Sequence, residues 1–399
     1  MAKSKNQIDH GERAHARFSP SSMGRIVHCP GSVVLGERVE KLFPQVDSPF
    51  AAEGTTAHEL CEVYLTPYAN PLIDPRELLK REKEIEKKCK ANKWDFEEMK
   101  HHAKDFRDYV IEIADASQGT LVQLEQKVTL EPLGIDSCWG TLDIAILVPF
   151  GTLHIIDFKY GAGVAVSAEI NYQLISYGLA VLHKYQDDFM FEDVKYHIFQ
   201  PRIPGGTNSY VQDTRVALEY VKIIKKATDD ASKPFGLKRS GDHCRWCPGR
   251  SLCPNLMQET IKMLETSPES IQFSPASAAE LLKTATLAKQ WADEFWALAT
   301  SQARRGTIPF GFKLVKGRAT RSWINDNAVI EEFKDLTEEE LFKKTLITPA
   351  QLEKIVGKEQ VEPFVDKSEG NLTLVHESDN RKAVDNKTEA AAAVFDDIT

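Results

Sequence analysis

The sequence lacks three features, and each absence argues against one class of protein. It has no run of about 18 apolar residues, the length that a helix needs to cross a bilayer, so we expect no membrane span. The N-terminus, MAKSKNQIDHGERAHARF, has no apolar core of a secretory signal, which predicts a cytoplasmic protein. There is no excess of positive charge either, because the formal net charge is −9, and this argues against a generally basic nucleic-acid coat. A local basic groove remains compatible with that charge, since binding depends on charge at the site.

The remaining composition is that of an ordinary globular protein, 42% hydrophobic and 27% charged. The 399 residues suffice for two domains or one elaborate domain. We expect a disordered N-terminus over residues 1–18 and a flexible, mildly acidic tail over 377–399. Between them, residues 270–376 read as a helical and mixed region that begins with a long amphipathic helix, 274–305.

The middle of the chain has the pattern of a mixed α/β domain. Strand-like runs occupy 120–130, 139–149, 152–160 and 194–201, and the second and third are close enough to form a hairpin. Residues 170–185 have helical periodicity. Upstream, the charged segment 76–117 reads as helical, and Thr56 and Glu59 have the spacing of a capping box at a helix start.

Two acids and a lysine stand at the ends of the hairpin strands. Asp143 lies in the second run and Asp157 in the third, and Lys159 follows Asp157 two positions later on the same face. Carboxylates with open positions suit Mg²⁺ or Mn²⁺. A divalent ion and a cation for the developing charge are the parts that phosphodiester hydrolysis needs. The alternative is that Asp157 and Lys159 form only a structural ion pair at a sheet edge.

Helical residues add further candidates. His58 lies one turn before Glu62 on the same helix face, and this histidine is a candidate to complete a metal shell. Gln173 and Tyr177 are likewise four apart and present an amide and a phenol, unless they only flank a buried stripe. Glu125, in the first strand, is another candidate acid, although it reads equally as a solvated strand residue.

Three of the seven cysteines are clustered. Cys244, Cys247 and Cys253 have the spacing C-x₂-C-x₅-C, which fits one metal centre better than disulfides in a cytosolic chain. A fourth ligand is needed, for which Cys29 is the natural candidate and His243 a weaker one. From this chemistry alone zinc is at least as acceptable as an iron–sulfur cluster.

The motifs GTTAHE, GTLD, DFK and QLISY occur in the order typical of one enzyme superfamily. The chain resembles the PD-(D/E)XK nucleases, and within them the RecB-like branch that includes the AddB nuclease domain and the CRISPR-associated exonucleases. The resemblance implies a restriction-endonuclease-like core, a mixed central sheet flanked by helices, within a nuclease domain over 19–260, with helical insertions and a C-terminal α+β extension. It further implies roles for individual residues: metal binding by His58, Asp143, Asp157 and the Phe158 carbonyl, catalysis by Asp143, Asp157 and Lys159, and substrate contacts by Gln173 and Tyr177.

The resemblance extends to the cysteines. RecB-like nucleases of this type carry one upstream cysteine and a downstream triplet that together bind a [4Fe–4S] cluster, which implies that Cys29, Cys244, Cys247 and Cys253 join the two ends of the domain. Zinc stays the alternative. The whole chain is also similar to an uncharacterised phage and prophage family assigned to these nucleases, which implies phage recombination or replication proteins as partners and a host-cell cytoplasmic location.

These expectations combine into one functional hypothesis. The chain is expected to be an Mg²⁺- or Mn²⁺-dependent DNA exonuclease that acts on single-stranded DNA or on free ends. A structure-selective or nicking endonuclease on the same core is the first alternative. The second, of another class, is a DNA-binding or scaffold protein whose nuclease site is vestigial.

Overall fold

The computed structural model describes residues 16–43, 49–117, 121–265, 275–317, 321–343, 345–346, 348–367, 372–376 and 384. It divides into two units, Met1–Gln290 and Trp291–Thr399, each with a hydrophobic core. Most of the two segments predicted to be disordered or flexible, 1–18 and 377–399, lies outside the described residues. Phe18 is described: it is 4% exposed, and its backbone N–H donates to the Ser137 carbonyl at 3.1 Å.

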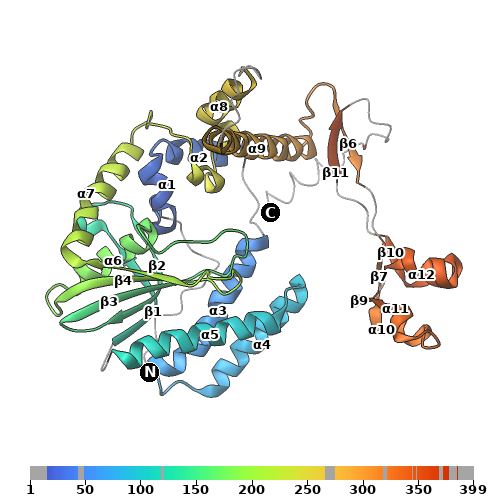
Figure 1. Ribbon diagram of the computed structural model, residues 1–399, viewed down its shortest axis with the longest axis horizontal. Coiled ribbons are helices and arrows are strands. Elements are labelled where there is room, and N and C mark those ends of the chain that lie inside the picture. Colours follow the sequence, from blue (N-terminus) through green and yellow to red (C-terminus); the bar gives the residue numbers. More distant parts are fainter. Residues whose placement is uncertain are drawn as a thin grey trace, which may run out of the picture. The chain divides into compact units, whose positions relative to one another are not determined.

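The first unit consists of helices around one sheet (Figure 1). Its N-terminal helices are η1 (Pro20–Ser22), α1 (Met23–His28), α2 (Ser32–Leu42), α3 (Pro49–Ala69), α4 (Pro75–Asn92) and α5 (Phe96–Ala116). The sheet strands and the turn between the first two are β1 (Leu121–Thr129), η2 (Glu131–Leu133), β2 (Trp139–Leu147), β3 (Gly151–Phe158), β4 (Phe191–Phe199) and β5 (Asn208–Asp213). The remaining helices are α6 (Tyr172–Lys184), α7 (Thr214–Ala231), η3 (Asp242–Trp246), η4 (Arg250–Leu252), α8 (Pro254–Glu265) and α9 (Pro275–Arg304), the last of which continues into the second unit.

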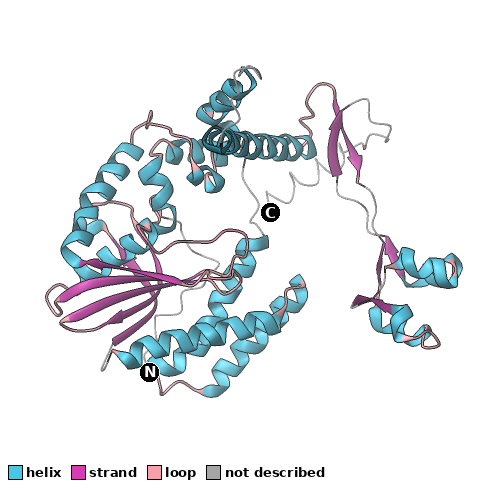
Figure 2. Ribbon diagram, viewed as in Figure 1, coloured by secondary structure: helices cyan, strands magenta, loops and turns pink. Residues whose placement is uncertain are grey.

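The sheet of five strands has the order β1-β2-β3-β4-β5 within the described residues. All neighbouring pairs are antiparallel except β3 and β4, which are parallel and are connected through α6. A parallel pair needs such a crossover, whereas β2 and β3 form the predicted hairpin. The prediction of a mixed α/β protein with helices flanking a central sheet is therefore confirmed (Figure 2).

Side chains on the two faces of the sheet enter two separate cores. On β3, Leu153 and Ile155 pack with residues of α6 and α7, whereas Ile156 and Phe158 pack with residues of α3 and α5. This alternation follows from the two-residue period of a strand. Because both faces are covered there, the middle of β2 and β3 is apolar, and a charged residue at the end of this stretch has to find a partner.

Most predicted elements occur within a few residues of their expected bounds. The four strand-like runs correspond to β1–β4, the 170–185 helix to α6, and 76–117 to α4 and α5. The predicted capping box at Thr56 is wrong, because α3 already begins at Pro49. Thr56 lies inside this helix, where its hydroxyl donates to the Ala52 carbonyl at 3.0 Å. A threonine at a helix interior makes this local bond when no free N–H remains to be capped.

The second unit is a small α+β region. Its strands are β6 (Phe312–Lys316), β7 (Arg321–Trp323), β8 (Phe342–Lys343), β9 (Thr345–Leu346), β10 (Val365–Lys367) and β11 (Leu372–His376). Its helices are α10 (Asp326–Glu332), α11 (Glu338–Leu341), α12 (Pro349–Val356), α13 (Lys358–Val361) and η6 (Glu362–Phe364). β6 pairs with β11 and β7 with β10, both antiparallel.

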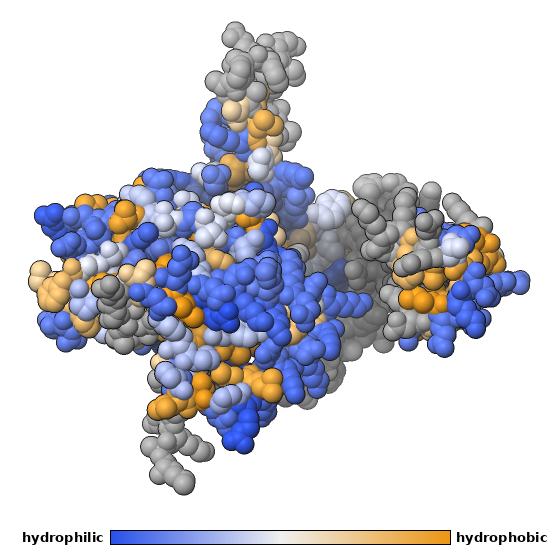
Figure 3. All heavy atoms as spheres, turned by 60° about the horizontal axis from the view of Figure 1, so that its bottom comes forward, coloured by the Kyte–Doolittle hydropathy of each residue, from blue (hydrophilic) through white to orange (hydrophobic). Residues whose placement is uncertain are grey.

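The described helices include none that is both long and apolar enough to span a membrane. Seen from the side of α4 and α5, the first unit is mostly hydrophilic, and hydrophobic side chains form only small patches (Figure 3). The charged segment 76–117 thus provides an amphipathic helical layer whose buried residues, among them Ile85, Met99 and Phe106, face the core.

Candidate functional site

Asp143 and Asp157 lie where the β2–β3 ladder stops. The last residues paired there are Ile144 and Ile156, so each acid is the next residue along its strand. Beyond that point a side chain links the two strands in place of the backbone, because the Asp143 Oδ2 accepts the backbone N–H of Phe158 at 2.9 Å. The opening of the ladder therefore leaves two carboxylates close together at one end of the hairpin, that of Asp157 buried and that of Asp143 partly buried.

Three ligand atoms converge beside this opening. One atom each of His58, Glu125 and Asp143 lies within 4.8 Å of the others. His58 comes from α3, and its Nδ1 is 3.3 Å from Asp143 Oδ1. The same residues, with Glu62, line a cavity of about 10 Å³, close to the smallest volume that admits one water molecule. An imidazole and two carboxylates at this spacing fit a single divalent cation.

Glu125 has an unusual backbone. Leu124 pairs with Ile144 and Gln126 with Leu142, so Glu125 stands opposite Asp143 at an irregular point of the β1–β2 ladder. Its φ is +43°, a region that residues other than glycine seldom adopt. Such strain is retained where surrounding structure enforces it, and it is common at functional sites.

The site is strongly coupled electrostatically. Burial lowers the pKa of His58, but the carboxylates of Asp143, Glu125 and Asp157 outweigh it and raise that pKa to about 9. The pKa of Asp143 is lowered overall. Burial raises it, but His58, the Phe158 N–H and Lys159 together lower it by more. His58 therefore carries a proton that neutralises part of the acidic charge in the metal-free protein.

Asp157, Lys159 and Gln173 form a second group next to the first. The Lys159 ammonium is 2.8 Å from Asp157 Oδ2 and donates to Gln173 Oε1 at 3.0 Å, and Gln173 Nε2 donates to Asp157 Oδ1 at 2.9 Å. Burial lowers the pKa of Lys159, but Asp157 and Asp143 raise it by more. The Asp157 Oδ2 atom is buried against the Lys159 ammonium, and a carboxylate oxygen has a second lone pair that can accept another cation.

The other candidates lie around these two groups. Tyr177 is 5% exposed and hydrogen-bonds Gln173. Its hydroxyl therefore helps to hold the Gln173 amide in place and does not face solvent. Glu62 forms an ion pair with Arg81 of α4 at 2.7 Å. The Phe158 ring packs in the core with its neighbours, and its carbonyl as a ligand stays a prediction.

The four candidate cluster cysteines are brought to one end of the first unit. All are buried and unbonded to other cysteines. Cys29 follows α1, and its Sγ accepts the Arg239 N–H at 3.4 Å, while Cys244 Sγ is 4.0 Å from the Arg239 carbonyl. The thiols of Cys29, Cys247 and Cys253 each contribute to raising the pKa of Cys244, after burial, to about 11. Within the described chain no three of these sulfurs lie within 4.8 Å of one another.

A half-buried arginine lies near two of these thiols, those of Cys29 and Cys247. Arg25, on α1, donates to the Ser32 hydroxyl at 2.7 Å, and no described carboxylate is in ion-pair distance. Burial lowers the Arg25 pKa, and the groups that act against this are Cys247 and Cys29. A guanidinium cannot release its proton under ordinary conditions, so this site needs negative charge nearby. Ionised thiols of Cys29 and Cys247 would supply it.

Sequence patterns did not point to Arg25 or Arg81. Neither lies in a recognised spacing, and the pairing of Arg81 with Glu62 depends on how α4 packs on α3. The sequence signal that did exist for Arg25 is its position four residues before Cys29, one helical turn away.

One family model, described as a protein of unknown function, DUF2800, matches residues 15–382. The match includes both groups of site residues, the four cysteines and nearly all of the second unit. Because it covers most of the 399 residues, the chain belongs to the DUF2800 family of proteins of unknown function.

Proposed function

We propose that this protein is a metal-dependent deoxyribonuclease, an exonuclease with the restriction-endonuclease-like core of the RecB-like PD-(D/E)XK branch. The observation that carries the proposal is the convergence of His58, Glu125 and Asp143 within 4.8 Å beside the Asp157–Lys159 pair. A purely structural ion pair would explain Asp157 and Lys159. It would not explain why a histidine and two more acids, from separate elements, converge half-buried beside them.

The residues present fit a hard divalent ion, Mg²⁺ or Mn²⁺. His58, Glu125 and Asp143 would hold it, with an oxygen of Asp157, whose other contacts are with Lys159 and Gln173. Oxygen-rich sites with one imidazole suit these ions. When bound, the ion supplies Lewis-acid polarisation of a phosphate and activation of water at neutral pH.

Lys159 and Gln173 have separable roles. Because its pKa is raised, Lys159 stays protonated and offsets the negative charge that develops on the phosphate oxygens. Gln173 bonds both partners of the Asp157–Lys159 pair and so fixes their orientation. Tyr177, which bonds Gln173, would then act on substrate through that amide rather than by direct contact.

The cysteines support a bound [4Fe–4S] cluster that joins α1 to the segment around η3 and η4. A single zinc ion with Zn–S bonds of about 2.3 Å needs sulfurs about 4 Å apart, closer than those of any three described cysteines here. A multinuclear cluster bridges wider spacings, and the Arg25 guanidinium would balance its negative charge. Zinc remains the alternative that metal analysis would identify.

The decisive experiment compares Lys159, which directly follows β3, with Lys127 of β1. Anaerobically purified full-length protein is incubated with end-labelled linear DNA and with circular DNA, single- and double-stranded, in Mg²⁺ or Mn²⁺. Lys159→Ala should lower cleavage at least about 100-fold, whereas Lys127→Ala, at an exposed position of β1, should not. Degradation of linear but not circular DNA would identify an exonuclease. Metal-dependent cleavage that survives Lys159→Ala would refute the mechanism.

A further inference from the structure

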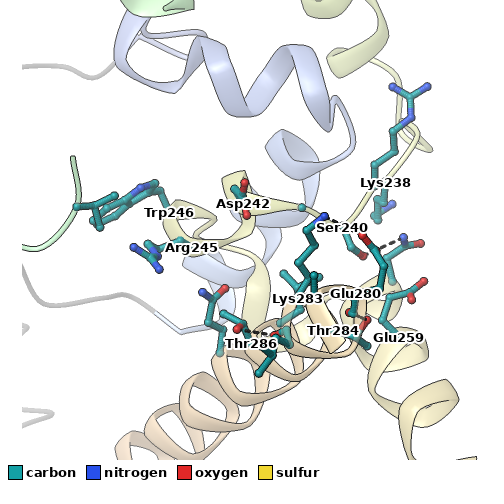
Figure 4. A pocket seen from close by; sticks show the side chains of 18 of the residues that line it. Lys238, Ser240, Asp242, Arg245, Trp246, Glu259, Glu280, Lys283, Thr284 and Thr286 are labelled. Atoms are coloured by element: carbon teal, nitrogen blue, oxygen red, sulfur yellow. Dashed lines mark hydrogen bonds and ion pairs between the residues drawn. The ribbon is translucent and has the colours of Figure 1, made fainter. Parts of the chain in front are cut away.

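A groove of about 1200 Å³ lies between the cysteine-bearing segment and the first half of α9, away from the acidic site. Its walls come from residues 238–246, from α8 and from α9 (Figure 4). Lys238, Arg239, Arg245 and Lys283 bring positive charge to it, and Trp246 brings an aromatic ring. The proposed catalytic chemistry makes no use of these residues.

Trp246 is the most unusual of them. Its side chain is 70% exposed, although it stands between Cys244 and Cys247, which are both buried. Backbone hydrogen bonds hold this turn, from Cys244 N–H to the Gly241 carbonyl at 2.9 Å and from Cys247 N–H to the Cys244 carbonyl at 3.1 Å. The ring is thus exposed on a backbone that is already ordered, so the protein loses little conformational freedom when a ligand stacks on the ring.

The charges of the groove favour an anionic ligand. Neither Arg239 nor Arg245 has a carboxylate within ion-pair distance in the described part of the chain, whereas Lys283 pairs with Glu280 at 2.8 Å. Asp242 and Glu259 also line the groove and limit its positive charge. Arg245 and Trp246 project side by side from η3 (Figure 4). One guanidinium beside an exposed indole and a second elsewhere on the groove wall match a strand of phosphates with unstacked bases.

We propose that this groove binds single-stranded DNA, with a base stacked on Trp246 and phosphates beside Arg239 and Arg245. Duplex DNA would not offer a free base face to the indole, and an apolar peptide would not use the two arginines. The choice of DNA as the polymer rests on the proposed nuclease function, but the binding itself is independent of cleavage.

The test measures binding under conditions without cleavage. Full-length protein without added divalent ion is titrated into a labelled oligo-dT of about 12 nucleotides, within the site sizes of known single-strand binders, and the dissociation constant is read from fluorescence anisotropy. Trp246→Ala should weaken binding about tenfold, the loss expected for one stacked base, and Trp246→Phe should weaken it less. Phe235→Ala is the matched control, because Phe235 is 94% exposed but does not line the groove.

A second variant guards against loss of folding at the cysteine turn. Arg245→Glu changes only an exposed side chain, and it should weaken binding and flatten its salt dependence. Unchanged affinity in both Trp246→Ala and Arg245→Glu would overturn the proposal, as would equal binding of an abasic strand or tighter binding of the matching RNA. If the nuclease proposal alone is wrong, Trp246→Ala still lowers affinity although no DNA is cut. If the groove proposal alone is wrong, cleavage persists and both variants bind as the unmodified protein does.

Discussion

A buried histidine should make the first unit sensitive to mild acid. His197, on β4, is 2% exposed, and its two ring nitrogens lie 2.8 Å from the Tyr109 hydroxyl and 3.1 Å from His154 Nδ1. Burial lowers the pKa of His197, and His154 and Lys195 lower it further, from 6.5 to about 3. The folded protein therefore excludes a proton that the unfolded chain accepts.

This difference in the His197 pKa between the folded and unfolded states determines how the free energy of unfolding changes with pH. Above the unfolded pKa of 6.5 both states are neutral at His197, and the site contributes its full stability. As the pH falls below 6.5, the unfolded state takes up the proton and the folded state does not, so stability is lost progressively toward about pH 3. At pH 5 the unfolded state gains about 2 kcal/mol from this one group. His154, whose pKa burial and Lys195 lower to about 4, adds to the loss by a smaller amount because water reaches it.

The assay is urea unfolding at pH 7.5 and pH 5.0, followed by far-UV circular dichroism. His197→Asn removes the titrating group, so the variant should lose about 2 kcal/mol less stability between these two pH values than the unmodified protein. His101→Asn is the control, because His101 is exposed on α5, and it should follow the unmodified protein. Equal pH dependence of unmodified protein and His197→Asn would refute the reasoning. That comparison uses a difference between proteins, so titrating groups that do not contact His197 cancel.

Three further predictions concern the proposed centres. Glu125→Gln keeps the shape but removes a charge, so Mn²⁺ affinity measured by calorimetry should fall about tenfold, while an unchanged affinity would exclude Glu125 as a ligand. Gln173→Leu removes two hydrogen bonds to charged groups, worth about 1.5–3 kcal/mol each, so kcat should fall at least tenfold with little change in KM. A fall in affinity alone would instead assign Gln173 to substrate binding. Arg25→Met should lower the iron or zinc content of the purified protein and its resistance to heat, whereas a full metal content would show that the centre does not need this cation.

Local sequence patterns were sufficient to predict the strands that carry Asp143 and Asp157. Alternation and turn residues located β2 and β3 and their hairpin, because a strand's two-residue period is visible within a few residues. The same hairpin placed Asp143 and Asp157 at neighbouring positions, since a short turn fixes the register. The capping box at Thr56 failed because the start of α3 depends on Pro49, several residues outside that motif.

The sequence by itself determined the chemistry available to this protein: the acid-x-lysine strand, the helical histidine and the cysteine triplet are local patterns that can be identified without coordinates. Only the tertiary structure decided which of these groups meet. Glu125 joins His58 and Asp143 through an irregular β1–β2 pairing, Gln173 reaches both Asp157 and Lys159, and Arg25 meets the thiol of Cys247, which is distant from it in the chain. Such contacts depend on how separate elements pack, and the free energy that selects one packing comes from the whole core rather than from any short segment.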